Sequence, residues 1–182
     1  MAVTIARWTL SDYHAMIAAG LLKDQQIELL NGLVVEMAPE GPEHADCSTL
    51  LMPQLWRMAN GRYQVRVGKP ISIPSSDSEP EPDIALVRDQ SYRKGHPTPK
   101  DVFLVIEFSQ SSLAKDTEDK RLVYAQAGIE DYWVINLRDR CAIVYRKPSN
   151  GDYQSEQKVF SGDLSPLAFP DVMIDVNRLL ES

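Results

Sequence analysis

Two neighbouring stretches decide the fold: SEPEPDIALV at residues 78–87 and DVFLVIEFSQSSLAKDTEDKRLVYAQA at residues 101–127. Asp83 stands where one apolar strand begins, and Glu107 stands near the end of a second apolar strand over residues 101–109. The near-continuous apolar run of the second strand is typical of a strand covered on both faces. If the two strands are antiparallel neighbours, the start of one lies beside the end of the other, and the two carboxylates meet.

The faces of the second strand follow from alternation. Successive side chains point to opposite sides of a sheet, so one face carries Val102, Leu104 and Ile106, and the other carries Phe103, Val105, Glu107 and Ser109. Glu107 continues a row of inward-facing apolar residues. An unpaired buried charge is costly, and we therefore expect Glu107 to have a partner.

The helix after this strand supplies a candidate partner. We expect Asp116 to cap the helix and Gly128 to end it. Lys120, Val123 and Tyr124 recur at helical spacing, so Lys120 shares a face with apolar residues. Two interpretations stay open: Lys120 is a lysine that reaches out to solvent from the edge of the packed face, or its amine reaches Glu107.

Asp83, Glu107 and Lys120 together have the composition of a phosphate-cleaving site. Two carboxylates can share Mg²⁺ or another divalent cation, whose ligands are oxygens. Such an ion polarises a phosphate and supplies a hydroxide-like water. Lys120 would orient that water or stabilise the negative charge that builds up in the transition state.

The remaining elements indicate a mixed sheet flanked by helices. The expected helices cover residues 10–19 and 42–60, and the expected strands cover residues 27–30, 33–37, 63–67, 70–73, 84–87, 131–136 and 141–147, with an edge strand near 151–160 and a short strand and helix in the tail. Asn31-Gly32 is a strong hairpin turn signal, and Pro53 should kink or divide its helix. This order of elements predicts one α/β domain.

Two polar residues in these elements have mainly structural interpretations. Glu28 lies within the first hairpin strand, where the pattern favours the solvent side. His44 lies in the first turn of the second helix, where a lone histidine is usually structural or solvent-facing.

Composition excludes several classes of protein. The chain has 182 residues, 43% apolar and 25% charged, which suits one globular domain. Cys47 and Cys141 are far apart and support neither a zinc site nor a disulfide framework. No apolar run approaches the roughly 20 residues of a membrane span, and the N-terminus lacks the pattern of a signal peptide. We therefore expect a cytoplasmic protein that does not enter a membrane.

The net charge and the distribution of charge along the chain point to different conclusions about DNA binding. The formal net charge of −7 counts against strong non-specific binding to nucleic acid. The charge is unevenly distributed, because residues 51–100 hold eight basic side chains against five acidic ones, whereas residues 1–50 hold two against seven. The basic middle, with its polar loop over residues 88–100, surrounds Asp83. It is either a solvated surface or a surface for DNA.

The combined motifs resemble a known family. They are E-P-D-I at residues 81–84, V-I-E-F-S at 105–109, D-x-x-x-K at 116–120 followed by Y-x-x-x-G, and D-Y-W-V-I-N at 131–136, preceded by I-E-L-L-N-G-x-V-V-E-M-A-P at 27–39 and by His44. In this order they resemble the Uma-type family of "putative restriction endonucleases", part of the PD-(D/E)xK nuclease superfamily. The resemblance runs from about Leu10 to Tyr153. It implies a restriction-endonuclease-like fold in a single domain over residues 1–182.

The resemblance implies roles for individual residues. It makes Asp83 and Glu107 the metal ligands of a DNA endonuclease. It also marks Glu28, His44, Asp116 and Lys120 as positions that match the family pattern. The chain departs from the wider superfamily at Ser109, where a lysine is expected two residues after the glutamate. Lys120 resembles a replacement that has moved to the helix, and activity then depends on its amine reaching the site.

Other functions remain open at this stage. The acidic net charge and the lysine missing at Ser109 also fit a catalytically inactive interaction module with the same fold. A hydrolase of small phosphorylated substrates is a further alternative. Serine-based catalysis is disfavoured, because no G-x-S-x-G turn presents a nucleophile. A homodimer would provide two copies for cutting two DNA strands, but no stretch of the sequence locates an interface.

Overall fold

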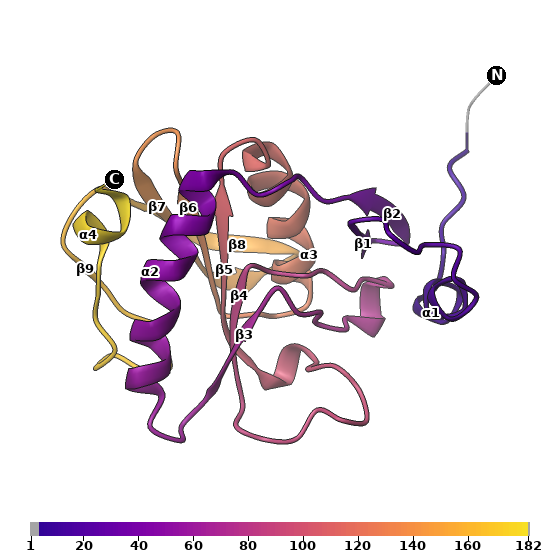
Figure 1. The fold of residues 1–182 in the computed structure, drawn as a ribbon, viewed down its shortest axis with the longest axis horizontal. Coiled ribbons are helices and arrows are strands. Elements are labelled where there is room, and N and C mark those ends of the chain that lie inside the picture. The colour runs from indigo at the N-terminus through magenta and orange to yellow at the C-terminus, as the bar shows by residue number, and fades with distance from the viewer. Residues whose placement is uncertain (1–3, 182) are drawn as a thin grey trace.

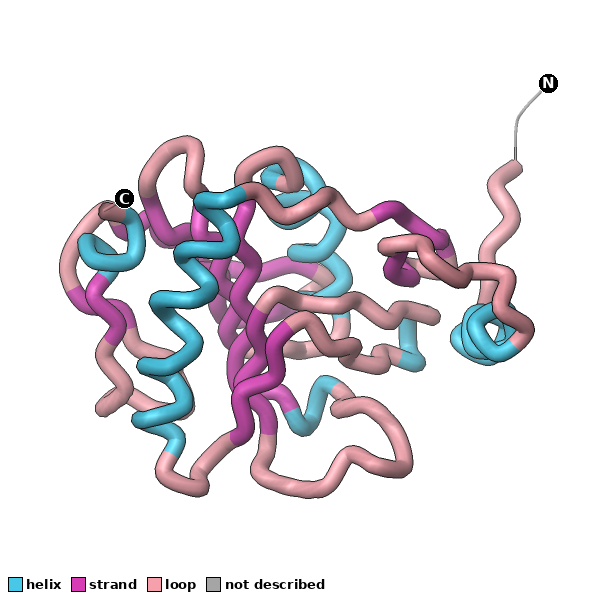
Figure 2. Tube along the Cα trace, viewed as in Figure 1, coloured by secondary structure: helices cyan, strands magenta, loops and turns pink. Residues whose placement is uncertain are grey.

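A six-stranded mixed sheet with helices on both faces forms the body of the protein (Figures 1 and 2). The computed structural model describes residues 4–181. The strands are β3 (Gln64–Val67), β4 (Ile84–Val87), β5 (Val102–Ser109), β6 (Asp131–Asn136), β7 (Cys141–Ser149) and β8 (Asp152–Val159). They lie in this order across the sheet, and only β5 and β6 are parallel. The predicted architecture, a mixed sheet flanked by helices, is confirmed.

Helices cover the two faces of the sheet with different side chains. On one face lie α2 (Pro42–Ala59) and α4 (Val176–Leu180), which pack against Leu104 and Ile106 of β5. On the other face lies a helix with two parts, the π-helical turn η3 (Lys115–Lys120) and α3 (Arg121–Gln126). The second face includes Val105, so Glu107, two residues further along the strand, points toward the η3–α3 helix.

The N-terminal segments project to one side of the body (Figure 1). They comprise α1 (Leu10–Ala18) and a hairpin of β1 (Ile27–Leu30) and β2 (Leu33–Glu36). Thr9 and Asp12 form the capping box that starts α1. Glu79, which is buried, binds His14 of α1 and so ties this projection to the segment that leads into β4.

Short elements complete the chain. They are the 3₁₀ turns η1 (Pro74–Ser76) and η2 (Pro99–Asp101) and a two-stranded sheet of β9 (Asp163–Leu164) and β10 (Ile174–Asp175). Among residues 4–181, no helix has both the length and the apolar character needed to cross a bilayer.

Three local expectations were wrong. Residues 70–73 do not form a strand; backbone bonds from Ile71 to Pro80 and from Ser72 to Pro97 hold them in an irregular path. Of the two effects expected of Pro53, a kink or a division of the helix, the division is wrong, because α2 is continuous. The register of β5 against β4 shifts between Leu86 and Val87, so that β5 has an extra residue at that end.

The register shift reverses the two residues at the start of β5. Phe103 packs on the face of Leu104, and Val102 packs on the face of Val105, the opposite of the simple alternation. Beyond the shift the alternation holds as far as Glu107. The pairing of Ile84 with Ile106 therefore sets Asp83, one residue before β4, beside Glu107.

Leu104 on β5 provides a test of this packing. Leu104 is fully buried, so Leu104→Ala should lower the free energy of unfolding by about 2–5 kcal/mol. Leu21 is 67% exposed, and Leu21→Ala should change it by less than about 0.5 kcal/mol. Urea unfolding measures both values. Equal losses in the two variants would contradict the placement of β5 at the centre of the core.

Candidate active site

Asp83 and Glu107 meet where β4 begins and β5 ends. The backbone N–H of Phe108 donates to Asp83 Oδ2 at 2.7 Å, and the backbone N–H of Asp83 donates to Glu107 Oε2 at 3.3 Å. Each carboxylate is thus held by the backbone that bears the other. The antiparallel register brings this pair together, as the sequence indicated.

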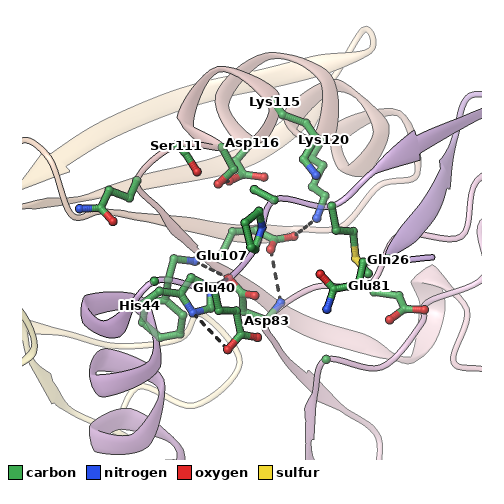
Figure 3. Close-up of a pocket in the computed structure, with 18 residues that line it drawn as sticks. Gln26, Glu40, His44, Glu81, Asp83, Glu107, Ser111, Lys115, Asp116 and Lys120 are labelled. Carbon is green, nitrogen blue, oxygen red and sulfur yellow. Dashed lines mark hydrogen bonds and ion pairs between the residues drawn. The ribbon is translucent and has the colours of Figure 1, made fainter. Parts of the chain in front are cut away.

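Lys120 points into the same site. Its Nζ lies 3.0 Å from Glu107 Oε1 and 3.1 Å from Glu28 Oε2, and Figure 3 shows it facing Glu107. Burial alone would lower the pKa of Lys120, but the carboxylates of Glu107 and Glu28 outweigh burial and raise it. The residue is only 3% exposed, so a lysine reaching out to solvent is excluded. The amine stays charged inside the protein.

Glu28 is buried and belongs to the site, contrary to the solvent-side interpretation. It has no exposed surface and accepts from Lys115 Nζ at 2.8 Å as well as from Lys120. The backbone N–H of Glu81 also donates to it, at 3.2 Å. The alternation of residues in the hairpin did not predict the burial of Glu28, because both faces of β1 are covered. All four residues of β1 are buried. Although burial raises the pKa of Glu28, the two lysines lower it overall.

Asp116 does not cap a helix, which corrects the sequence prediction. The helix begins earlier, and Asp116 is buried within η3. Its Oδ2 accepts from the hydroxyls of Ser109 and Ser112, each at 2.6 Å. Ser109, at the place of the expected lysine, therefore fastens the end of β5 to the helix that carries Lys120. Burial raises the pKa of Asp116, against the opposing effect of Lys120.

The π-helical turn η3 explains how several polar residues of one helix reach the cavity. A π turn is wider than an α turn, and such turns are frequent at functional sites. Lys115, Asp116 and Lys120 all lie within η3 and all line the cavity. In an α-helix, residues one and five positions apart do not share one face. No motif in the sequence predicts this π-helical turn.

His44 contacts Asp83 from the first turn of α2. Its Nε2 lies 2.9 Å from Asp83 Oδ2, and its ring packs edge-on against Phe108 with 5.4 Å between ring centroids. Burial lowers the pKa of His44, but the hydrogen bond and charge of Asp83 overcome this and raise it. The resemblance, and not the spacing, had singled out this histidine.

These residues line one cavity of about 270 Å³ (Figure 3). Five carboxylates but only two lysines line it; the acids are Glu40, Glu81, Asp83, Glu107 and Asp116, and the lysines are Lys115 and Lys120. Burial and the nearby negative charge of Asp83 raise the pKa of Glu107 well above its usual value, although Lys120 opposes this. The cavity therefore holds more acidic groups than its lysines neutralise.

Sequence reasoning missed four members of this site. Glu40, Glu81 and Lys115 line the cavity, and the hydroxyl of Tyr124 donates to Glu107 Oε1 at 3.1 Å. Glu81 lies two residues before Asp83 in an extended segment. Side chains two positions apart in such a segment point to the same side, so the sequence could have indicated that Glu81 faces the site. Tyr124 is four residues after Lys120 on the same helical face, which also indicated a shared direction.

Comparison with known proteins places this architecture in a family. The family model described as "Uma2: Putative restriction endonuclease" matches residues 10–177, a span that contains every site residue named above. The chain belongs to the Uma2 family. No curated protein matches this Uma2 chain.

A solved structure shares the Uma2 fold. It is the crystal structure of "a putative nuclease belonging to DUF820" from Anabaena variabilis ATCC 29413, with a TM-score of 0.71 and 14% sequence identity. The match covers 95% of this chain and 97% of that one. At this identity the likeness concerns the fold, which is a mixed sheet flanked by helices in a single domain.

Replacing Glu28 tests the buried ion pairs. Glu28→Gln leaves Lys120 with one carboxylate fewer, and at pH 7 it should lower the free energy of unfolding by about 3–5 kcal/mol. The pKa of Glu28 is lowered in the folded protein, so its contribution is complete above about pH 4.5 and is lost as the pH falls through the lowered pKa. The difference between wild type and variant should therefore shrink below pH 4.5.

The control for this comparison is Glu36→Gln, an exposed glutamate on the other strand of the hairpin. Urea unfolding at several pH values follows both variants. A difference between wild type and Glu28→Gln that grows as the pH falls would contradict the role of ionised Glu28.

Proposed function

We propose that this Uma2 protein is a divalent-metal-dependent endonuclease that hydrolyses phosphodiester bonds in DNA. The observation that carries the proposal is the meeting of Asp83, Glu107 and Lys120 in one cavity. The family description and the nuclease-like fold support the same activity. A catalytically inactive interaction module would be favoured if Lys120 pointed to solvent. Lys120 is buried and faces Glu107, which weighs against that alternative.

The donor set fits a hard divalent cation. Among residues 4–181, Asp83 Oδ1 accepts no hydrogen bond, and the Glu81 carboxylate makes no hydrogen bond or ion pair. Burial, reinforced by Glu28, raises the pKa of Glu81, so a cation beside it would be stabilising. Asp83 and Glu107 would hold Mg²⁺ or a similar ion, with Glu81 as a further oxygen donor. When bound, the ion would polarise a phosphate oxygen and lower the pKa of a bound water.

Lys120 acts beside these carboxylates as a fixed positive charge. An ammonium group has three donors; two of those of Lys120 go to Glu107 and Glu28, and one remains. That N–H would orient the attacking water or stabilise charge on the phosphate. Glu28 and Tyr124 keep the ammonium and the Glu107 carboxylate in place.

A basic surface leading to the cavity supports DNA as the substrate. The loop after β4 exposes Arg88, Arg93 and Lys94, and its Tyr92 lies under the guanidinium of Arg66 on the edge strand β3. Gly68, the residue that follows β3, lines the cavity. Four residues of strand span about 13 Å, a distance over which one DNA strand can contact both places.

Replacing Asp83 tests the activity. Asp83→Asn removes a charged ligand, and Mg²⁺- or Mn²⁺-dependent nicking of supercoiled plasmid should fall by at least about 100-fold. Asp163→Asn, an exposed aspartate on β9, should nick like the wild type. Agarose gels follow the conversion of supercoiled to open-circular DNA. Unchanged nicking by Asp83→Asn would remove Asp83 from the mechanism, and a wild type inactive with every divalent cation would favour the non-catalytic module.

The two lysines that share Glu28 should differ in their effect on rate. Lys120→Met should slow nicking about 100- to 1000-fold, because it removes a fixed charge at the reacting phosphate. Lys115→Met should slow nicking less, since Lys115 contacts Glu28 but not Glu107. The nicking rates of the two variants are compared at saturating DNA, and thermal unfolding verifies that both variants are folded. A larger loss in Lys115→Met would reverse the assigned roles.

A further inference from the structure

The edge strand β8 has a neighbour on one side only. It is the last strand of the six-stranded sheet and pairs only with β7 among residues 4–181. Outside the strand ladders, no backbone-to-backbone hydrogen bond in this range involves its residues. A strand of eight residues therefore presents free N–H and C=O groups along its outer side. Such an edge is the template on which a further strand pairs.

The middle of β8 carries two opposite charges on one face. Glu156, Gln157 and Lys158 are all exposed. Glu156 lies opposite Tyr145 of β7, and Lys158 lies opposite Ile143, so both charges are on the face of the sheet that α3 covers. Neither side chain makes a hydrogen bond or an ion pair within the part of the chain that the structure describes.

These charges decide how β8 can pair with the β8 strand of a second copy. A two-fold axis normal to the sheet gives both copies the same contact surface. Residues that face each other in an antiparallel pair lie on the same side of the sheet, so one residue must face its own copy at the axis. If that residue were Glu156 or Lys158, like charges would meet, which is destabilising. If it is Gln157, Glu156 of each copy faces the partner's Lys158.

We propose that β8 is a homodimer interface, in which two copies pair antiparallel about Gln157 and join their sheets edge to edge. Two reciprocal ion pairs between Glu156 and the partner's Lys158 fix the register. Phe160, just beyond the strand, is 62% exposed and would be partly covered by the partner strand. The cavity lies at β4 and β5, which β6 and β7 separate from β8. The interface therefore leaves both cavities open and does not require that DNA be cut.

Reversing the charges tests the interface. Sedimentation equilibrium of the whole chain is measured at low ionic strength, where exposed ion pairs are least screened. The wild type should dimerise. Glu156→Lys and Lys158→Glu should each weaken the dimer about 10-fold or more, because two pairs per dimer change from attraction to repulsion. Both substitutions in one chain exchange the charges and should restore the dimer. An equimolar mixture of the two single variants should form a heterodimer.

A cysteine substitution tests the register. The Cα atoms of Gln157 and its own copy would lie about 4.5–5.5 Å apart, within the range that a disulfide bridges. Gln157→Cys should therefore form a covalent dimer on mild oxidation, as seen on gels without reductant. Gln154→Cys changes an exposed residue of the same strand whose two copies would lie about 20 Å apart, and it should not cross-link. Cys47 and Cys141 are buried and do not compete.

Four results would overturn the interface. They are a wild type that is monomeric at its highest soluble concentration, single charge variants that dimerise like the wild type, a folded double variant that stays monomeric, and cross-linking of Gln154→Cys as readily as Gln157→Cys. Glu36→Lys makes the same change of net charge on an exposed residue of β2 and should dimerise normally. A dimer that never nicks DNA would refute the proposed function and leave this inference standing.

Discussion

The buried ammonium of Lys120 is the interaction on which the site depends. It joins three segments that are distant in sequence: the hairpin strand β1 through Glu28, the central strand β5 through Glu107, and the turn η3 that carries Lys120 itself. Removing any one of these charges removes at least one ion pair from a site with little access to water, where an uncompensated charge is expensive. The site and the attachment of the hairpin to the sheet are therefore one structural unit.

Much of the fold and the central acid pair could be predicted, because they follow from local rules. The apolar run of β5 and the short strand after Asp83 fix two neighbouring strands, and their antiparallel register alone brings Asp83 to Glu107. Helical spacing placed Lys120 on the packed face, and its amine does reach Glu107. In these cases a period of two or of 3.6 residues determines the direction of a side chain.

The errors arose where long-range contacts override the local pattern. Glu28 alternates like a solvent-side residue, yet it is buried because two lysines from a distant helix neutralise it. Asp116 resembles a helix cap, yet the helix starts before it and the serines at 109 and 112 bind its carboxylate.

The separation of the paired charges along the chain has a consequence for biosynthesis. Glu28 and Lys115 are 87 positions apart, and the β5 strand that completes the acid pair lies between them in sequence. On the ribosome, the early hairpin emerges with its glutamate hydrated and unpaired, and the ion pairs of Glu28 form only after the late helix has left the exit tunnel. Contacts of such long range close slowly. The cavity is thus assembled only after most of the chain has been synthesised, and a nascent fragment ending before residue 115 carries the acids without the lysines that organise them.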